Sequence, residues 1–142
     1  MSITLSLLEI ETLLAARLET AKKEFSGKLI QRLDIGVFPW HGAIELSLLL
    51  ADDTCDVEDI AGWPNYNFSD AQNGKWPEAL NIYRRMQTLW EAGTKSTESF
   101  ALFGEAVKSR HVQSVVNEFN RSEGFLVTLF DPDRKNSENY CA

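Results

Sequence analysis

Long hydrophobic runs are missing from this chain of 142 residues, and its uninterrupted apolar stretches, such as residues 48–51, are short. A membrane-spanning helix needs about 18 or more apolar residues, so the sequence predicts no span and no membrane partner. No Lys or Arg precedes the apolar residues at the start of the chain, and Glu9 and Glu11 interrupt them, which is unlike a secretory signal. We therefore expect a cytoplasmic protein.

Cysteine is also scarce. The chain has two, Cys55 and Cys141, and the second lies next to the last residue. Two cysteines in a domain of this size do not make a disulfide framework. In a reducing compartment we expect both to be free thiols.

The motifs of common catalytic and metal sites are missing as well. The chain has no glycine-rich phosphate loop, no Gly-x-Ser-x-Gly and no Cys/His set for zinc. Its clustered carboxylates could ligate Ca²⁺ or Mg²⁺, but they lack the glycine and glutamate positions of an EF-hand. We therefore expect no cofactor, no metal and no enzymatic activity. The open alternative is a small enzyme in which His41 acts as a base beside Cys55 or nearby carboxylates.

The composition is that of an ordinary globular protein, with 44% hydrophobic and 25% charged residues. A chain of this length favours one domain over residues 1–142, with a loose tail at 134–142. Its net charge of −7 predicts no nucleic-acid partner, because proteins that bind nucleic acids place cations on phosphates.

Hydrophobic periodicity predicts three helices. The first begins at Ser6, where a hydroxyl and Glu9 form a capping-box sequence. The second carries Trp90 on its apolar stripe, and the third contains Gly104, which could bend or divide it. The predicted helices cover residues 6–27, 76–93 and 97–121.

Alternation of apolar and polar residues predicts two strands, at 29–38 and 43–51, joined by a short turn. A third strand is expected at 125–130, and residues 52–74 are expected to form a long loop. The resulting order, α-β-β-α-α-β, predicts an α+β domain. We expect a small antiparallel sheet of about three strands, with the helices packed on one face.

The net charge is confined to one segment. Residues 1–42 hold five acids and five bases, and residues 73–142 hold nine of each, so both are neutral. Residues 43–72 hold seven acids and no Lys or Arg, which accounts for the whole charge of −7. Such carboxylates repel one another, and fold stability does not require them to be together.

Aromatic residues accompany these acids, and Trp40 and Trp63 lie in expected turns, where exposure is predicted. Exposed aromatics beside concentrated charge are typical of a protein-binding surface. The open alternative is a solvated acidic loop whose aromatics turn inward to cap the core. We predict that the partner-binding residues are Asp52, Asp53, Asp56, Glu58, Asp59, Trp63 and Tyr66.

In size, element order and the run from Ile44 to Asp70, the chain resembles the small acidic immunity proteins that bacteria encode beside toxin genes. The resemblance implies an inhibitor that binds a toxin domain, such as a nuclease with a basic surface, and blocks its active site. It brings no catalytic residues. A third possibility is a homodimeric structural or regulatory protein that pairs through exposed aromatics.

Overall fold

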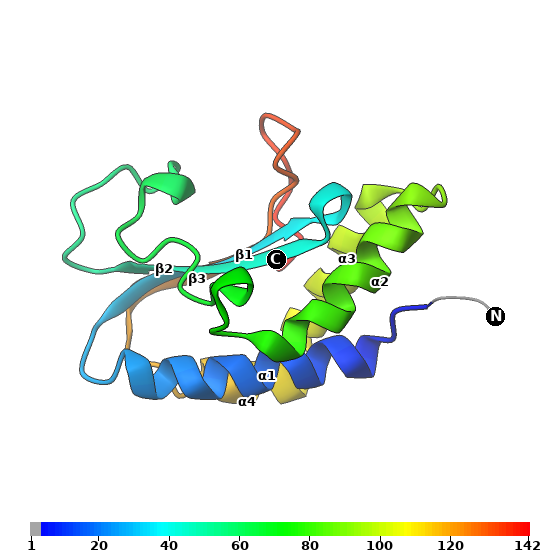
Figure 1. Ribbon diagram of the computed structural model, residues 1–142. Coiled ribbons are helices and arrows are strands. Elements are labelled where there is room, and N and C mark those ends of the chain that lie inside the picture. Colours follow the sequence, from blue (N-terminus) through cyan, green and yellow to red (C-terminus); the bar gives the residue numbers. More distant parts are fainter. Residues whose placement is uncertain (1–3) are drawn as a thin grey trace.

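The computed structural model describes residues 4–142 and arranges them as helices beneath a small sheet (Figure 1). The predicted α+β class and the number of strands are confirmed, and the order differs from the prediction only in that the third predicted helix is two helices. The α-helices are α1 (Leu7–Glu24), α2 (Leu80–Glu91), α3 (Ser96–Lys108) and α4 (Arg110–Val116), and the strands are β1 (Ile30–Phe38), β2 (Ala43–Leu50) and β3 (Arg121–Thr128).

Helix α1 begins as its sequence predicts. The Ser6 hydroxyl accepts the backbone N–H of Glu9 at 3.1 Å, and the Glu9 carboxylate accepts the backbone N–H of Ser6 at 3.2 Å. This reciprocal capping box satisfies two free amides at the helix start. Ile10, Leu14 and Leu18, on the apolar stripe of the helix, are completely buried in the core.

Strands β1 and β2 form the predicted antiparallel hairpin, with Leu33 opposite Leu48 and Ile35 opposite Leu46. The chain reverses through the short 3-10 turn η1 (Pro39–His41) and Gly42, which has a φ of 60°. A Cβ on Gly42 would lie 2.5 Å from the backbone oxygen of Tyr83, so a larger residue would collide with α2.

Strand β3 corrects the prediction of a purely antiparallel sheet. It pairs with β1 in the parallel direction, so the sheet is mixed, in the order β2-β1-β3. The connection from β1 to β3 runs through β2 and then through residues 51–120, which include helices α2, α3 and α4. The end of β2 and the start of β3 both lie beside Ile30 at the start of β1, so β3 runs in the same direction as β1. The backbone N–H of Ile30 donates to the oxygen of Asn120 at 2.8 Å, which places the start of β3 beside the start of β1.

The long helix predicted over residues 97–121 is divided at Ser109. This residue has an extended backbone, and its hydroxyl accepts the N–H of Val112 to cap α4. Gly104 lies in unbroken helix, where a Cβ would come within 2.4 Å of the Tyr140 backbone oxygen. The glycine therefore admits the C-terminal segment and does not bend the helix.

The last residues are held in place, whereas the sequence predicts a loose tail. The backbone N–H of Tyr140 donates to the oxygen of Leu129 at 2.9 Å. The Asn139 side chain accepts from the N–H of Leu129 and donates to the oxygen of Val127, both at 3.0 Å. These bonds attach the C-terminal segment to the end of β3.

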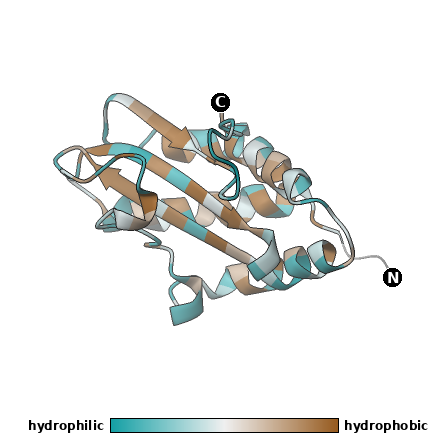
Figure 2. Cartoon of the chain, turned by 90° about the horizontal axis from the view of Figure 1, so that it is seen from above, coloured by the Kyte–Doolittle hydropathy of each residue, from teal (hydrophilic) through white to brown (hydrophobic). Residues whose placement is uncertain are grey.

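The helices lie on one face of the sheet, as predicted, and two long segments cover the other (Figure 1). We call that second face the outer face. Hydrophobic and hydrophilic bands alternate along the strands when the sheet is viewed from above (Figure 2). Leu33, Ile35 and Val37 belong to the core on the helical side, so Asp34 and Gly36 between them belong to the outer face.

Candidate functional site

The acidic segment, as residues 51–72 are called below, leaves the end of β2 and returns along the free edge of that strand. The backbone N–H of Leu48 donates to the oxygen of Asn65 at 3.2 Å, and that of Phe68 donates to the oxygen of Leu46 at 2.9 Å. The Ser47 and Ser69 hydroxyls add hydrogen bonds between the two segments. Much of the stretch predicted to be a long loop is therefore held against the sheet edge. The remaining part, residues 52–62, projects from the sheet and is called the acidic loop below.

The five carboxylates predicted to bind a partner all lie on the acidic loop. Four of them, Asp52, Asp56, Glu58 and Asp59, are exposed, and Asp53 is half-buried. Within residues 4–142 no Lys or Arg lies within ion-pair distance of any of the five. The loop therefore presents negative charge that the described part of the fold does not pair.

Two of these carboxylates also shape the loop. An oxygen of Asp53 accepts the backbone N–H of Leu50 at 2.8 Å, and an oxygen of Asp56 accepts that of Glu58 at 2.9 Å. Short-range bonds of this kind are how Asp stabilises turns. Asp53 and Asp56 therefore have a structural role. The carboxylates of Asp52 and Glu58 accept no hydrogen bond from residues 4–142.

Trp63 corrects the prediction of an exposed anchor. It is 3% exposed, and its indole N–H donates to the backbone oxygen of Asp56 at 3.3 Å. Trp63 does not belong to the main hydrophobic core, and neither does Leu49, which is completely buried on the outer face of β2. Trp63 thus closes the acidic loop and is not available to a partner. Trp90, predicted to be buried, is 41% exposed on α2.

Tyr66, the other predicted anchor, remains partly exposed, and its hydroxyl donates to the carboxylate of Glu45. Burial, followed by the bonded Glu45 carboxylate, raises the pKa of Tyr66 to about 12. The two residues lie at the edge of a cavity of about 260 Å³ on the outer face. Aromatic side chains of Phe38 and Phe130 line the same cavity.

Asp34 is the site residue that the sequence does not predict. Its alternation in β1 predicts a solvated position, yet it is 5% exposed and lines the same cavity. The Thr128 hydroxyl donates to one carboxylate oxygen at 2.6 Å. Burial raises the pKa of Asp34 to about 7, and the bond from Thr128 opposes that rise. The burial comes from segments far along the chain, so no local sequence signal could have predicted it.

A second hollow of about 470 Å³ adjoins this cavity and contains His41. Glu45, Tyr66 and Asp133 also line it, whereas Cys55 does not. Within residues 4–142 the His41 ring makes no hydrogen bond. The structure therefore places His41 near carboxylates but gives no support for the pairing with Cys55.

A third cavity, of about 500 Å³, is lined by more basic than acidic residues. Arg32, Arg134 and Lys135 line it together with Glu58 of the acidic loop. One Arg32 nitrogen donates to the backbone oxygen of Gly124 at 3.1 Å. The acidic loop therefore faces a small basic region across the outer face, although no ion pair joins the two in the described residues.

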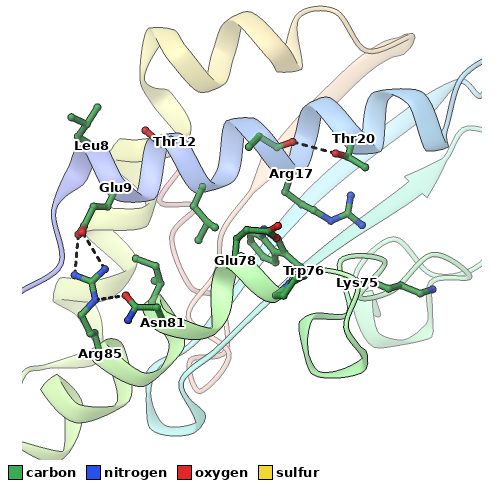
Figure 3. Close-up of a pocket in the computed structure, with 14 residues that line it drawn as sticks. Leu8, Glu9, Thr12, Arg17, Thr20, Lys75, Trp76, Glu78, Asn81 and Arg85 are labelled. Atoms are coloured by element: carbon green, nitrogen blue, oxygen red, sulfur yellow. Dashed lines mark hydrogen bonds and ion pairs between the residues drawn. The ribbon is translucent and has the colours of Figure 1, made fainter.

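The helical side has a groove of its own, about 730 Å³ in volume, between α1 and the start of α2 (Figure 3). It is largely apolar, and the ion pair between Glu9 and Arg85, at 3.0 Å, crosses one end. Arg17 and Trp76 also line it. None of the predicted partner-binding residues lies in this groove.

No helix in residues 4–142 is long and apolar enough to cross a membrane. In the same part of the chain, no three His, Cys, Asp or Glu side chains come together in a way that could hold a metal ion. The clustered carboxylates of the acidic loop thus do not converge on one point.

Comparisons with protein-family models, with curated proteins and with solved structures find no match to this chain. The resemblance to immunity proteins therefore stays a prediction.

Proposed function

We propose that this chain is a protein-binding inhibitor of the immunity type, which neutralises a partner through its acidic loop. The partner is expected to have a cationic cleft, as a toxin nuclease has where it binds phosphates. The inhibitor would present Asp52, Asp56, Glu58 and Asp59 where those phosphates sit, with the half-buried Asp53 behind them. Tyr66 is an exposed aromatic beside this surface.

The observation that carries the proposal is the unpaired charge of the acidic loop. Like charges on one surface loop repel each other by about 1 kcal/mol or less per pair in water, so their clustering does not stabilise the fold. A cationic partner would relieve this repulsion and would be steered toward the loop during encounter. The loop is also held at both ends by hydrogen bonds to β2. Little conformational entropy would therefore be lost on binding.

The test compares two triple variants with the same change in charge. The loop variant is Asp52→Asn, Glu58→Gln and Asp59→Asn, and the control is Glu91→Gln, Glu105→Gln and Glu123→Gln. All six residues are exposed. The tagged chain captures its partner from the native host, and association rates are then measured with the purified partner at several salt concentrations.

We expect the loop variant to associate about tenfold more slowly at low salt and to lose most of the salt dependence, because steering acts on the association rate. The control should associate like the unmodified chain. Equal association rates for the two variants would refute the proposal.

The hollow around His41 favours a second candidate, a small enzyme. His41 is exposed there, with Glu45 and Asp133 nearby to orient it or share its proton. The two candidates differ in a cell-protection assay against the captured partner. An inhibitor would keep its protective effect in His41→Gln and lose it in the loop variant, whereas an enzyme would show the reverse.

A further inference from the structure

The cavity that Asp34, Glu45 and Tyr66 line is built from three parts of the chain. Strands β1 and β2 form its floor, where the Phe38 ring packs against Gly36 and a Cβ would lie 3.0 Å from a ring carbon. Ile60 and Ala61 of the 3-10 turn η2 (Ile60–Gly62) cover one side. Phe130 and Pro132, from the segment after β3, close the other. At about 260 Å³, the cavity suits a group smaller than a drug-sized ligand.

The charged groups of this cavity are all negative. Asp34 and Glu45 line it, and no Lys or Arg is among its lining residues. Asp34 uses one carboxylate oxygen to accept from Thr128, and its second oxygen accepts no hydrogen bond from residues 4–142. A buried carboxylate without a counter-ion is costly, and a cation placed in the cavity would offset that cost.

The remaining walls are aromatic and apolar. Phe38, Tyr66 and Phe130 supply three rings, and the last two are also partly exposed at the rim. Aromatic faces attract organic cations, and rings that surround a quaternary ammonium are a recurrent way of binding one. A bare metal ion would find few oxygen ligands here, and no metal-binding cluster is found in the described residues.

We propose that this cavity binds an organic ammonium group, such as a primary or methylated alkylamine. The Asp34 and Glu45 carboxylates face the positive charge, while Phe38, Tyr66 and Phe130 enclose the attached carbons. The ammonium could belong to a free amine or to a lysine side chain of a protein. This inference does not depend on the proposed inhibitor function, because it concerns the isolated chain and a small ligand.

The experiment titrates the isotope-labelled chain with three small probes and follows its amide NMR signals. The probes are choline, its uncharged analogue 3,3-dimethylbutan-1-ol, and n-butylammonium. We expect saturable shifts with the two cations at the amides of Gly36, Ser47 and Ala61, and much weaker effects with the uncharged analogue. Equal binding of the uncharged analogue, or no saturable shift with either cation, would overturn the proposal.

Variants locate the binding in the cavity. Asp34→Asn and Glu45→Gln should each weaken cation binding about tenfold or more, as expected for the loss of a charged partner. Ala61→Leu should block binding by filling the cavity while both carboxylates remain. Glu58→Gln is the matched control, because it removes the same charge from the acidic loop outside this cavity. If Glu58→Gln weakens cation binding and Ala61→Leu does not, the cations are only attracted to the acidic loop. That result would refute binding in the cavity.

A fourth probe separates the two sources of the ammonium. Nα-acetyl-lysine methylamide carries the lysine side chain between blocked backbone groups. Binding equal to that of n-butylammonium would assign the cavity to a lysine side chain of a protein, and exclusion of the blocked lysine would assign it to a free amine. Both results support an ammonium site, and neither requires the inhibitor function to be correct.

Discussion

The Arg17 guanidinium of α1 donates to the backbone oxygen of Phe68 at 3.2 Å and lies 5.2 Å from the centre of the Phe68 ring. The same side chain pairs with Glu24 at 2.8 Å and is almost completely buried. These contacts join the end of the acidic segment to the first helix, 51 residues earlier in the chain. Arg17, from the N-terminal part of the chain, therefore helps to position the negatively charged segment.

Arg17→Met should loosen this connection. The backbone oxygen of Phe68 would lose a charged donor, and we expect a loss of about 1–3 kcal/mol in the free energy of unfolding. Urea denaturation measures that change, and hydrogen exchange of the Phe68 amide should become faster. Arg84→Met, on the exposed side of α2, is the control and should change neither quantity. Unaltered exchange at Phe68 in Arg17→Met would contradict the assigned role.

Asp34 should make stability fall as pH rises. Its pKa is about 7 in the folded chain and 3.8 as an ordinary carboxyl, so the folded state holds the proton more tightly. Its stabilising contribution is complete below pH 3.8 and is lost as pH rises through 7. At about 1.4 kcal/mol per pH unit, the loss between pH 5 and pH 8 is on the order of 2–3 kcal/mol.

Asp34→Asn should remove this dependence, because an amide keeps an acceptor for Thr128 and does not ionise near neutral pH. Urea denaturation at both pH values, with the difference between the variant and the unmodified chain taken at each, isolates the one group. The variant should gain stability relative to the unmodified chain from pH 5 to pH 8. A constant difference would mean that Asp34 titrates normally.

The carboxylates of the acidic loop should separate into structural and free groups. Asp53→Ala removes the acceptor for the Leu50 amide and should lower the free energy of unfolding by about 1 kcal/mol. Asp52→Ala, one position earlier, has no such bond to lose and should leave stability unchanged or slightly higher as repulsion falls. Thermal unfolding of the two single variants provides the comparison. Equal melting temperatures would show that the Asp53 bond contributes nothing.

Replacing Trp63 should destabilise the fold more than replacing Trp90, although the local sequence predicts that Trp63 is exposed and Trp90 is buried. Trp63→Ala removes a buried ring that is hydrogen-bonded to the acidic loop, and we expect a loss of about 3–5 kcal/mol in the free energy of unfolding. Trp90→Ala, at a position that is 41% exposed, should lower stability by about 1 kcal/mol or less. Urea denaturation of both variants tests this order. A larger loss in Trp90→Ala would contradict the described packing.

The sequence alone determined the elements whose signals are local. The capping box of Ser6 and Glu9, the alternation in residues 29–38 and 43–51, and the α+β order all follow from hydrogen bonds and periodicities within a few positions. The location of the negative charge also follows from the sequence, because the segment at 43–72 contains no Lys or Arg wherever it folds.

Only the tertiary structure decided the direction of β3, the burial of Asp34 and Trp63, and the cavities of the outer face. Each depends on residues that are distant in the chain. The Asp34 carboxylate accepts from Thr128, which lies 94 positions later in the chain. Strand β3 reaches its place beside β1 only after the chain has passed through β2 and three helices. Alternation predicts which side of a strand a residue occupies, but it does not reveal whether another segment will cover that side.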